Sequence, residues 1–193
     1  MPGGHSLGKG QPSSTGSLVV SAVSLMVVEL TEDQLEGKHI VISCSQSFGD
    51  IRVETHAYID CGATGYAFVD DEFAHQYQIP KFQLKKPKTV EVIDGRPIAS
   101  GDITHLAKAT HSILEHHENL PKFITALGHY PIVLGTPWLR QHNVGIWFTS
   151  DLITFGSQYC LAHCTELPTT IKVMQQDPPQ CHHRPPHYKQ HQV

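Results

Sequence analysis

The sequence predicts a mostly β fold, in which short strands form a small closed barrel accompanied by one or two short helices. Three observations support this fold class. Several segments alternate apolar and polar residues, Asp94-Gly95 is a hairpin-forming dipeptide, and only two stretches carry helix-start signals. Alternation with a period of two is typical of strands that bury one face, and a small closed barrel is an architecture that such strands favour.

Composition indicates one folded domain between two flexible ends. The chain has 193 residues, of which 39% are hydrophobic, enough for one core. Residues 1–36 are expected to be a flexible N-terminal segment, because the first 17 are rich in Gly, Ser and Pro. Residues 37–160 are assigned to the folded domain, and residues 161–193 to a flexible Pro- and His-rich tail.

Two hairpins are predicted in the first half of this domain. Alternation through residues 40–44 precedes a second strand that places four residues on one face: Val53, Thr55, Ala57 and Ile59. Residues 46–50 are expected to join these strands. Further on, residues 89–93 and 96–99 flank Asp94-Gly95, which supplies the positive φ angles of a tight turn.

The second half of the domain combines strands with the two predicted helices. Residues 122–127 and 132–134 are expected to be strands, and residues 145–148 should pair with residues 152–155. One helix should have Asp70 as its N-cap. The other should have Thr136 as N-cap and Pro137 at its first helical position.

Charge and cysteine content limit the classes of partner and compartment. A formal net charge of −4 gives no basic surface for neutralising phosphates, so no nucleic-acid partner is expected. The apolar run over residues 18–30 is too short to span a bilayer, so no membrane partner is expected. Five cysteines without the spacing of a disulfide scaffold favour a reducing, intracellular and cytoplasmic location.

No metal or other cofactor is expected. A zinc module built from Cys160, His163 and Cys164, with downstream ligands from Cys181, His182 or His183, lacks the paired spacing of common zinc fingers. His116, His117 and Glu118 lack the His-Glu-x-x-His spacing of metallopeptidases. We therefore interpret that triplet as a solvated loop between strands.

The segment with the clearest chemical potential is an acidic loop. Residues 58–65 read Tyr-Ile-Asp-Cys-Gly-Ala-Thr-Gly, so that a strand delivers Asp60 into a turn of small residues. Gly62 has no Cβ and Ala63 is small, which lets a substrate backbone or a second subunit approach closely. An isolated Asp-x-Gly tripeptide is more often an ordinary loop turn. The interpretation therefore depends on a second segment.

That second segment consists of Ile132, Val133, Leu134 and Gly135, followed by Thr-Pro-Trp-Leu at residues 136–139. Residues 60–65 resemble the Asp-Ser/Thr-Gly-Ala loop of the retropepsin-like aspartic peptidases, and residues 132–139 resemble the second signature of that family. The nearest resemblance is to the peptidase segment of gypsy-type LTR retrotransposon polyproteins. The likeness runs over residues 39–155 and includes the order of the motifs.

This resemblance implies a homodimeric aspartic endopeptidase that acts on a polypeptide, such as a retrotransposon polyprotein, within the cytoplasm or a retrotransposon particle. Each chain would contribute Asp60 to a pair of carboxylates sharing one proton. Residues 90–101 correspond in position to the flap of the family, although they also fit a hairpin in the barrel wall. The implied substrate-binding residues are Gly62, Ala63, Thr64, Ile93, Asp94 and Gly95.

One residue departs from the family pattern. Cys61 stands where the family has Ser or Thr, whose hydroxyl braces the two loops across the dimer axis. A thiol is a weaker hydrogen-bonding group. Cys61 is therefore expected at the dimer interface. It motivates an alternative hypothesis, in which the chain is a catalytically inactive dimerisation domain from a decayed retroelement.

Overall fold

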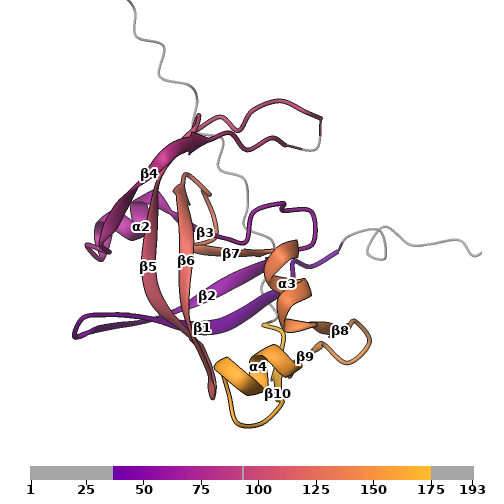
Figure 1. Ribbon diagram of the computed structural model, residues 1–193. Coiled ribbons are helices and arrows are strands. Elements are labelled where there is room, and N and C mark those ends of the chain that lie inside the picture. The colour runs from indigo at the N-terminus through magenta and orange to yellow at the C-terminus, as the bar shows by residue number, and fades with distance from the viewer. Residues whose placement is uncertain (1–36, 93, 175–193) are drawn as a thin grey trace, which may run out of the picture. The chain divides into compact units, whose positions relative to one another are not determined.

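Six strands close into a barrel in the computed structural model, which describes residues 37–92 and 94–174 (Figure 1). Around the barrel the order is β1-β2-β7-β3-β6-β5, and pairing of Ser45 in β1 with Ser112 in β5 completes the ring. The strands are β1 Val41–Phe48, β2 Ile51–Asp60, β3 Ala67–Asp70, β5 Ile103–Ile113, β6 His116–Thr125 and β7 Ile132–Gly135. The predicted closed, mostly β barrel is confirmed.

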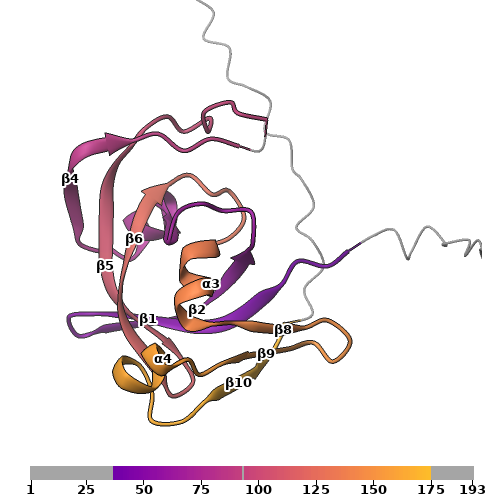
Figure 2. The same cartoon turned by 45° about the vertical axis from the view of Figure 1, so that its right-hand side comes forward.

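The remaining elements surround this ring. Strand β4, Lys81–Lys88, pairs with β5 outside the closed circuit. A separate sheet has the order β10-β9-β8, and it lies below the barrel in the turned view (Figure 2). Its strands are β8 Gly145–Trp147, β9 Leu152–Phe155 and β10 Thr169–Lys172, and the helices are α2 Asp71–Gln76, α3 Thr136–His142 and α4 Gln158–His163. Among the described residues, no helix has the length and apolar character needed to cross a membrane.

The first predicted hairpin is confirmed, with a shorter turn. Strands β1 and β2 pair antiparallel from Val41 with Tyr58 to Phe48 with Ile51. Only Gly49 and Asp50 remain as the turn, and Gly49 takes a positive φ of 56°. On β2, Val53, Ala57 and Ile59 are buried and Thr55 is half-buried, as the alternation predicted.

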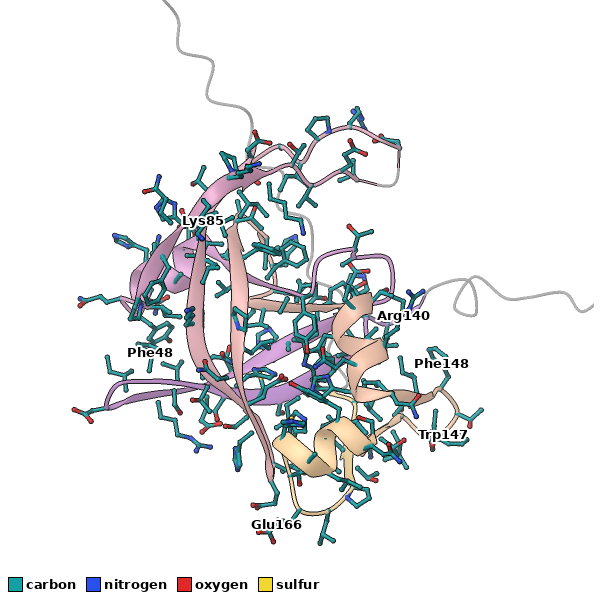
Figure 3. All side chains as sticks on the ribbon, viewed as in Figure 1. Phe48, Lys85, Arg140, Trp147, Phe148 and Glu166 are labelled. Atoms are coloured by element: carbon teal, nitrogen blue, oxygen red, sulfur yellow. The ribbon has the colours of Figure 1, made fainter. Side chains whose placement is uncertain are left out.

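The predicted pairing of the later strands is also confirmed. Strand β8 pairs antiparallel with β9, with Ile146 opposite Ile153. The strand ends at Trp147, one residue earlier than predicted, and Phe148 lies in the turn with 75% of its surface exposed. Figure 3 shows Trp147 and Phe148 projecting from this hairpin, whereas Ile153 and Phe155 face the core.

Both predicted helices form, but one begins differently. The Asp70 side chain accepts a hydrogen bond from the backbone N–H of Phe73, which confirms the predicted N-cap of α2. The prediction for α3 is wrong in register: Gly135 is the N-cap and Thr136 is already helical. The Thr136 hydroxyl is not used for capping, because it donates to the carbonyl of Cys61.

The predicted boundary at residue 160 needs correction, because the fold continues into the segment expected to be a flexible tail. Helix α4 is capped by Ser157, whose hydroxyl accepts from the N–H of Cys160. Strand β10 pairs with β9 and buries Thr169 and Ile171. Pro168 immediately precedes β10, where its missing N–H costs no ladder hydrogen bond. Residues 1–36 and 175–193 lie outside the described residues.

The interpretation of His116, His117 and Glu118 as a solvated loop is wrong. These residues begin β6, which pairs with β5 through Ile113 and His116. A two-residue turn separates the strands, so the inward face of β6 starts at His116. The side chain of His116 is fully buried.

Candidate active site

The acidic loop lies where β2 ends beside β7. These two strands run parallel, and their register places Asp60 next to Gly135. The loop turns back at once, because the N–H of Ala63 donates to the Asp60 carbonyl at 3.3 Å. The N–H of Gly62 donates to Asp60 Oδ1 at 2.8 Å. This half-buried carboxylate is therefore oriented by its own turn.

The second segment, Ile132 to Gly135, contacts the acidic loop directly. The N–H of Gly135 donates to the carbonyl of Tyr66, and the N–H of Thr136 donates to the carbonyl of Ala63, both at 3.0 Å. A Cβ at Gly135 would collide with the carbonyl oxygen of Gly65 and lie 2.9 Å from that of Ala63. Only glycine fits this close backbone approach. The side chains of Ile132 and Leu134 are fully buried beneath the loop, and Val133 is 7% exposed.

The hydroxyl of Thr136 is a site feature that sequence reasoning missed. It donates to the Cys61 carbonyl at 2.5 Å, so it fixes the acidic loop from the start of α3. Its position directly after Gly135 could have indicated this role. A hydroxyl at this point is placed by the same close approach that requires the glycine.

Tyr58 is a second feature that the sequence did not single out. It lies two residues before Asp60 on β2, and therefore on the same face of the strand. Its ring stacks on that of Tyr130 with centroids 4.8 Å apart. Partial burial raises the pKa of Tyr58, and the nearby charge of Asp60 raises it further. An aromatic platform thus adjoins the carboxylate.

The second predicted hairpin forms as a turn closed by an isolated bridge between Glu91 and Pro97, and the described residues of 89–93 and 96–99 do not form the two predicted strands. The N–H of Val92 donates to the carbonyl of Arg96, and that of Ile98 donates to the carbonyl of Val90, both at 2.9 Å. Gly95 has a positive φ of 81°. The Asp94 carboxylate accepts hydrogen bonds from both the backbone N–H and the guanidinium of Arg96, an arrangement that lowers its pKa.

The base of this hairpin and the acidic loop pack on the same apolar cluster. Its buried members are Phe68, Ile103 and Val133, and Ala63, Val90 and Ile98 pack against them. Residues 91–92 and 94–97 are exposed. Among the predicted site residues, Asp60 to Thr64 thus form one loop, and Asp94 and Gly95 lie in the adjoining hairpin. Ile93 lies outside the described residues.

A family model covers both segments of the site. The family model for the PEG10/RTL1 protease domain matches residues 56–164, which is more than half of the chain and includes both segments of the site. Among solved structures, the chain is similar to the retroviral protease-like domain of Ddi1 from Leishmania major. The identity is 10%, the match covers 74% of this chain and 100% of that chain, and the TM-score is 0.43.

Proposed function

This chain belongs to the PEG10/RTL1 protease domain family, and from that premise we propose that it is an aspartic endopeptidase that works as a homodimer. The observation that carries the proposal is the position of Asp60. Its carboxylate is half-buried, held by the N–H of Gly62, and supported from below by the close contact of Gly135 with the loop.

A dimer follows from the number of suitable carboxylates. Water activation of this type needs two carboxylates that share a proton, and the sequence contains a single Asp-x-Gly-Ala loop. Asp94 cannot supply the second, because it is exposed in the hairpin turn and bonded to Arg96. A second copy of Asp60, related by a two-fold axis, meets the requirement.

In the proposed reaction, the ionised Asp60 takes a proton from a water molecule held between the two carboxylates. The protonated Asp60 of the other chain polarises the scissile carbonyl, and no covalent enzyme intermediate forms. Gly62, Ala63 and Thr64 would lie along the peptide, with Ile93, Asp94 and Gly95 above it. The proposed substrate is a polypeptide of retroelement origin, cut in the cytoplasm or within a particle.

The second candidate function is an inactive dimerisation domain, and Cys61 is the observation that favours it. Incubating the purified chain with a diverse peptide mixture separates the two hypotheses. The mixture is sampled from acid to neutral pH, with and without pepstatin, and read by mass spectrometry. Cleavage that pepstatin blocks is the result expected of the peptidase. A stable dimer that leaves every peptide intact would support the inactive domain.

Cys61→Ser is expected to strengthen the dimer. Cys61 is exposed in the single chain, and we propose that it meets its symmetry mate at the two-fold axis. A serine hydroxyl would form better bracing hydrogen bonds, each worth about 1 kcal/mol net. The dissociation constant should therefore fall by roughly tenfold, which corresponds to 1.4 kcal/mol. Analytical ultracentrifugation and activity measured across a dilution series would check this.

The specific activity of Cys61→Ser should exceed that of the parent most at low protein concentration, where dissociation limits the active fraction. Cys44→Ser replaces a buried cysteine of β1 and serves as the control, which should leave dimerisation unchanged. Equal dissociation constants for Cys61→Ser and the parent would remove the argument that Cys61 weakens the dimer.

The hairpin at residues 90–101 is expected to become protected when a peptide-like inhibitor binds. Its tip is exposed and closed by few hydrogen bonds, so its amides should exchange quickly in the free protein. Hydrogen exchange with mass spectrometry would measure the change. The β1–β2 turn at Gly49 and Asp50 serves as the internal reference. Unchanged exchange at residues 90–101 in the inhibited enzyme would exclude a flap at this position.

A further inference from the structure

A second group of reactive side chains lies at the junction of β6, α3 and α4. Candidate ligand atoms of His116, His142 and Cys160 all lie within 4.8 Å of one another, and all three residues are buried. Candidate ligand atoms of Glu118, His142 and Cys164 meet the same limit. The two sets share His142, so the other four side chains gather around its imidazole.

The environment of the His116 side chain indicates that this cluster binds a ligand. This side chain is fully buried, yet neither ring nitrogen has a hydrogen-bond partner among residues 37–92 and 94–174. A buried polar group without a partner is destabilising, and nearly all such groups in folded proteins are satisfied. A neutral imidazole keeps a lone pair on one ring nitrogen, which can coordinate a metal ion.

His142 is already held in the orientation of a metal ligand. Its Nδ1 lies 2.9 Å from the carbonyl oxygen of Trp138, which can only accept, so Nδ1 carries the proton. In the neutral ring, the lone pair of Nε2 then faces Cys164 Sγ at 3.9 Å and Glu118 Oε2 at 3.5 Å. The His142 Nε2 lone pair and the Glu118 carboxylate oxygen are both acceptors, and a cation between them would be bound by both.

We propose that His116, His142, Cys160 and Cys164 bind a zinc ion, with the carboxylate of Glu118 beside it. Two imidazoles and two thiolates form a common structural zinc site, with ligands about 2.0–2.3 Å from the metal. Within each of the two sets the ligand atoms lie within 4.8 Å of one another, so the side chains need to close around His142 to form a tetrahedron.

Proton release accompanies binding at this site. A cysteine sulfur binds a metal ion as the thiolate, so each thiol must lose its proton. The zinc ion replaces one proton on each of the two sulfurs, and the two protons pass to solvent. The thiolates then balance the charge of the ion. The carboxylate of Glu118 beside the ion adds one further negative charge, and the indole N–H of Trp138 donates a hydrogen bond to it.

The position of the cluster gives the ion access from solvent and a structural role. Cys164 lines an open groove of about 730 Å³, together with His117 and Leu167, so the site can be reached from solvent. Figure 3 shows Glu166 beyond α4, in the loop that borders this groove. The ion would join α4 and α3 to β6, where the N–H of His117 already donates to the carbonyl of Cys164.

This ligand set differs from the zinc module considered from the sequence. His163 is exposed, and its Nδ1 contacts the carbonyl of Tyr159 at 3.0 Å. Cys181, His182 and His183 lie outside the described residues. The new partners, His116 and His142, are far from Cys160 in sequence, so no spacing motif reveals them.

The test uses the full chain without a His tag, produced in zinc-supplemented medium and freed of loose metal by gel filtration. We expect one tightly bound zinc ion per chain by elemental analysis. After exchange to Co²⁺, we expect tetrahedral d–d bands and a charge-transfer band with the intensity of two thiolates. Cys160→Ser and Cys164→Ser should each reduce the zinc content to near zero and weaken the charge-transfer band.

Two matched variants distinguish this site from other ligands. His163→Ala, on the same helix, and Cys181→Ser should both keep the full zinc content. Asp60→Asn should also keep it, because the site is independent of peptidase activity. Loss of zinc in either matched variant would overturn the proposed ligand set. So would a parent chain without bound zinc or cobalt–thiolate absorption, as expected if His142 is an imidazolium paired with Glu118. The cobalt spectrum of the parent decides the point even where a variant fails to fold.

Discussion

Asp60→Asn is expected to abolish peptidase activity and leave the fold intact. The amide keeps the shape of the side chain, and its oxygen can still accept from the N–H of Gly62. It removes both the charge and the exchangeable proton on which the general base and general acid depend. Cleavage should fall by about 10⁴-fold or more, the upper range for general acid–base catalysis. Initial rates on a cleaved peptide, measured from acid to neutral pH, would show the loss.

The thermal unfolding midpoint of Asp60→Asn should match that of the parent. Asp50→Asn, in the β1–β2 turn, is the matched control and should keep full activity. Dimers of one parent and one Asp60→Asn chain should also be impaired, because they keep a single carboxylate. If Asp60→Asn cleaves at a rate near that of the parent, Asp60 is not catalytic.

Gly135→Val is expected to destabilise the whole domain. Its Cβ alone would collide with the carbonyl of Gly65, and the branched methyl groups would add further overlap beneath the acidic loop. Overpacking of a core typically costs about 1–3 kcal/mol, and a clash with backbone belongs at or above about 3 kcal/mol. Urea denaturation followed by circular dichroism would measure the lost free energy of unfolding.

Gly37→Val is the matched control for this substitution. A Cβ at Gly37 meets no atom of the described residues within 4 Å, so the same valine should have little effect there. An unfolding free energy for Gly135→Val equal to that of Gly37→Val would contradict the close approach of β7 to the acidic loop.

Sequence patterns predicted those parts of the fold that depend on local periodicity. The alternation on β2 gave the correct buried face, since neighbouring side chains on a strand point to opposite sides. Asp70 was found because an N-cap bonds a backbone N–H only three residues away. The acidic loop and the Ile132–Gly135 segment were joined by their resemblance to a family. Nothing in their separate patterns places Asp60 beside Gly135.

The features that were missed depend on contacts between distant residues. Strand β10 is short and follows a proline, and its pairing with β9 makes it a strand. His116 looks like part of a polar run, but the two-residue turn after β5 directs it into the core. Thr136 was interpreted as the N-cap of α3. Its hydroxyl instead bonds the Cys61 carbonyl, which is 75 residues away in the sequence and therefore escapes a local pattern.

The parallel pairing of β2 with β7 also determines when the acidic loop is assembled during synthesis. A nascent chain carries Asp60 long before it carries Gly135, Thr136 and the strand that supports the loop. Closing so long a segment of chain costs entropy that local contacts do not recover, so this pairing forms late. The acidic loop is therefore assembled only after β7 and α3 have left the ribosome. Until then, the growing chain carries Asp60 without the contacts of Gly135 and Thr136 that order its loop.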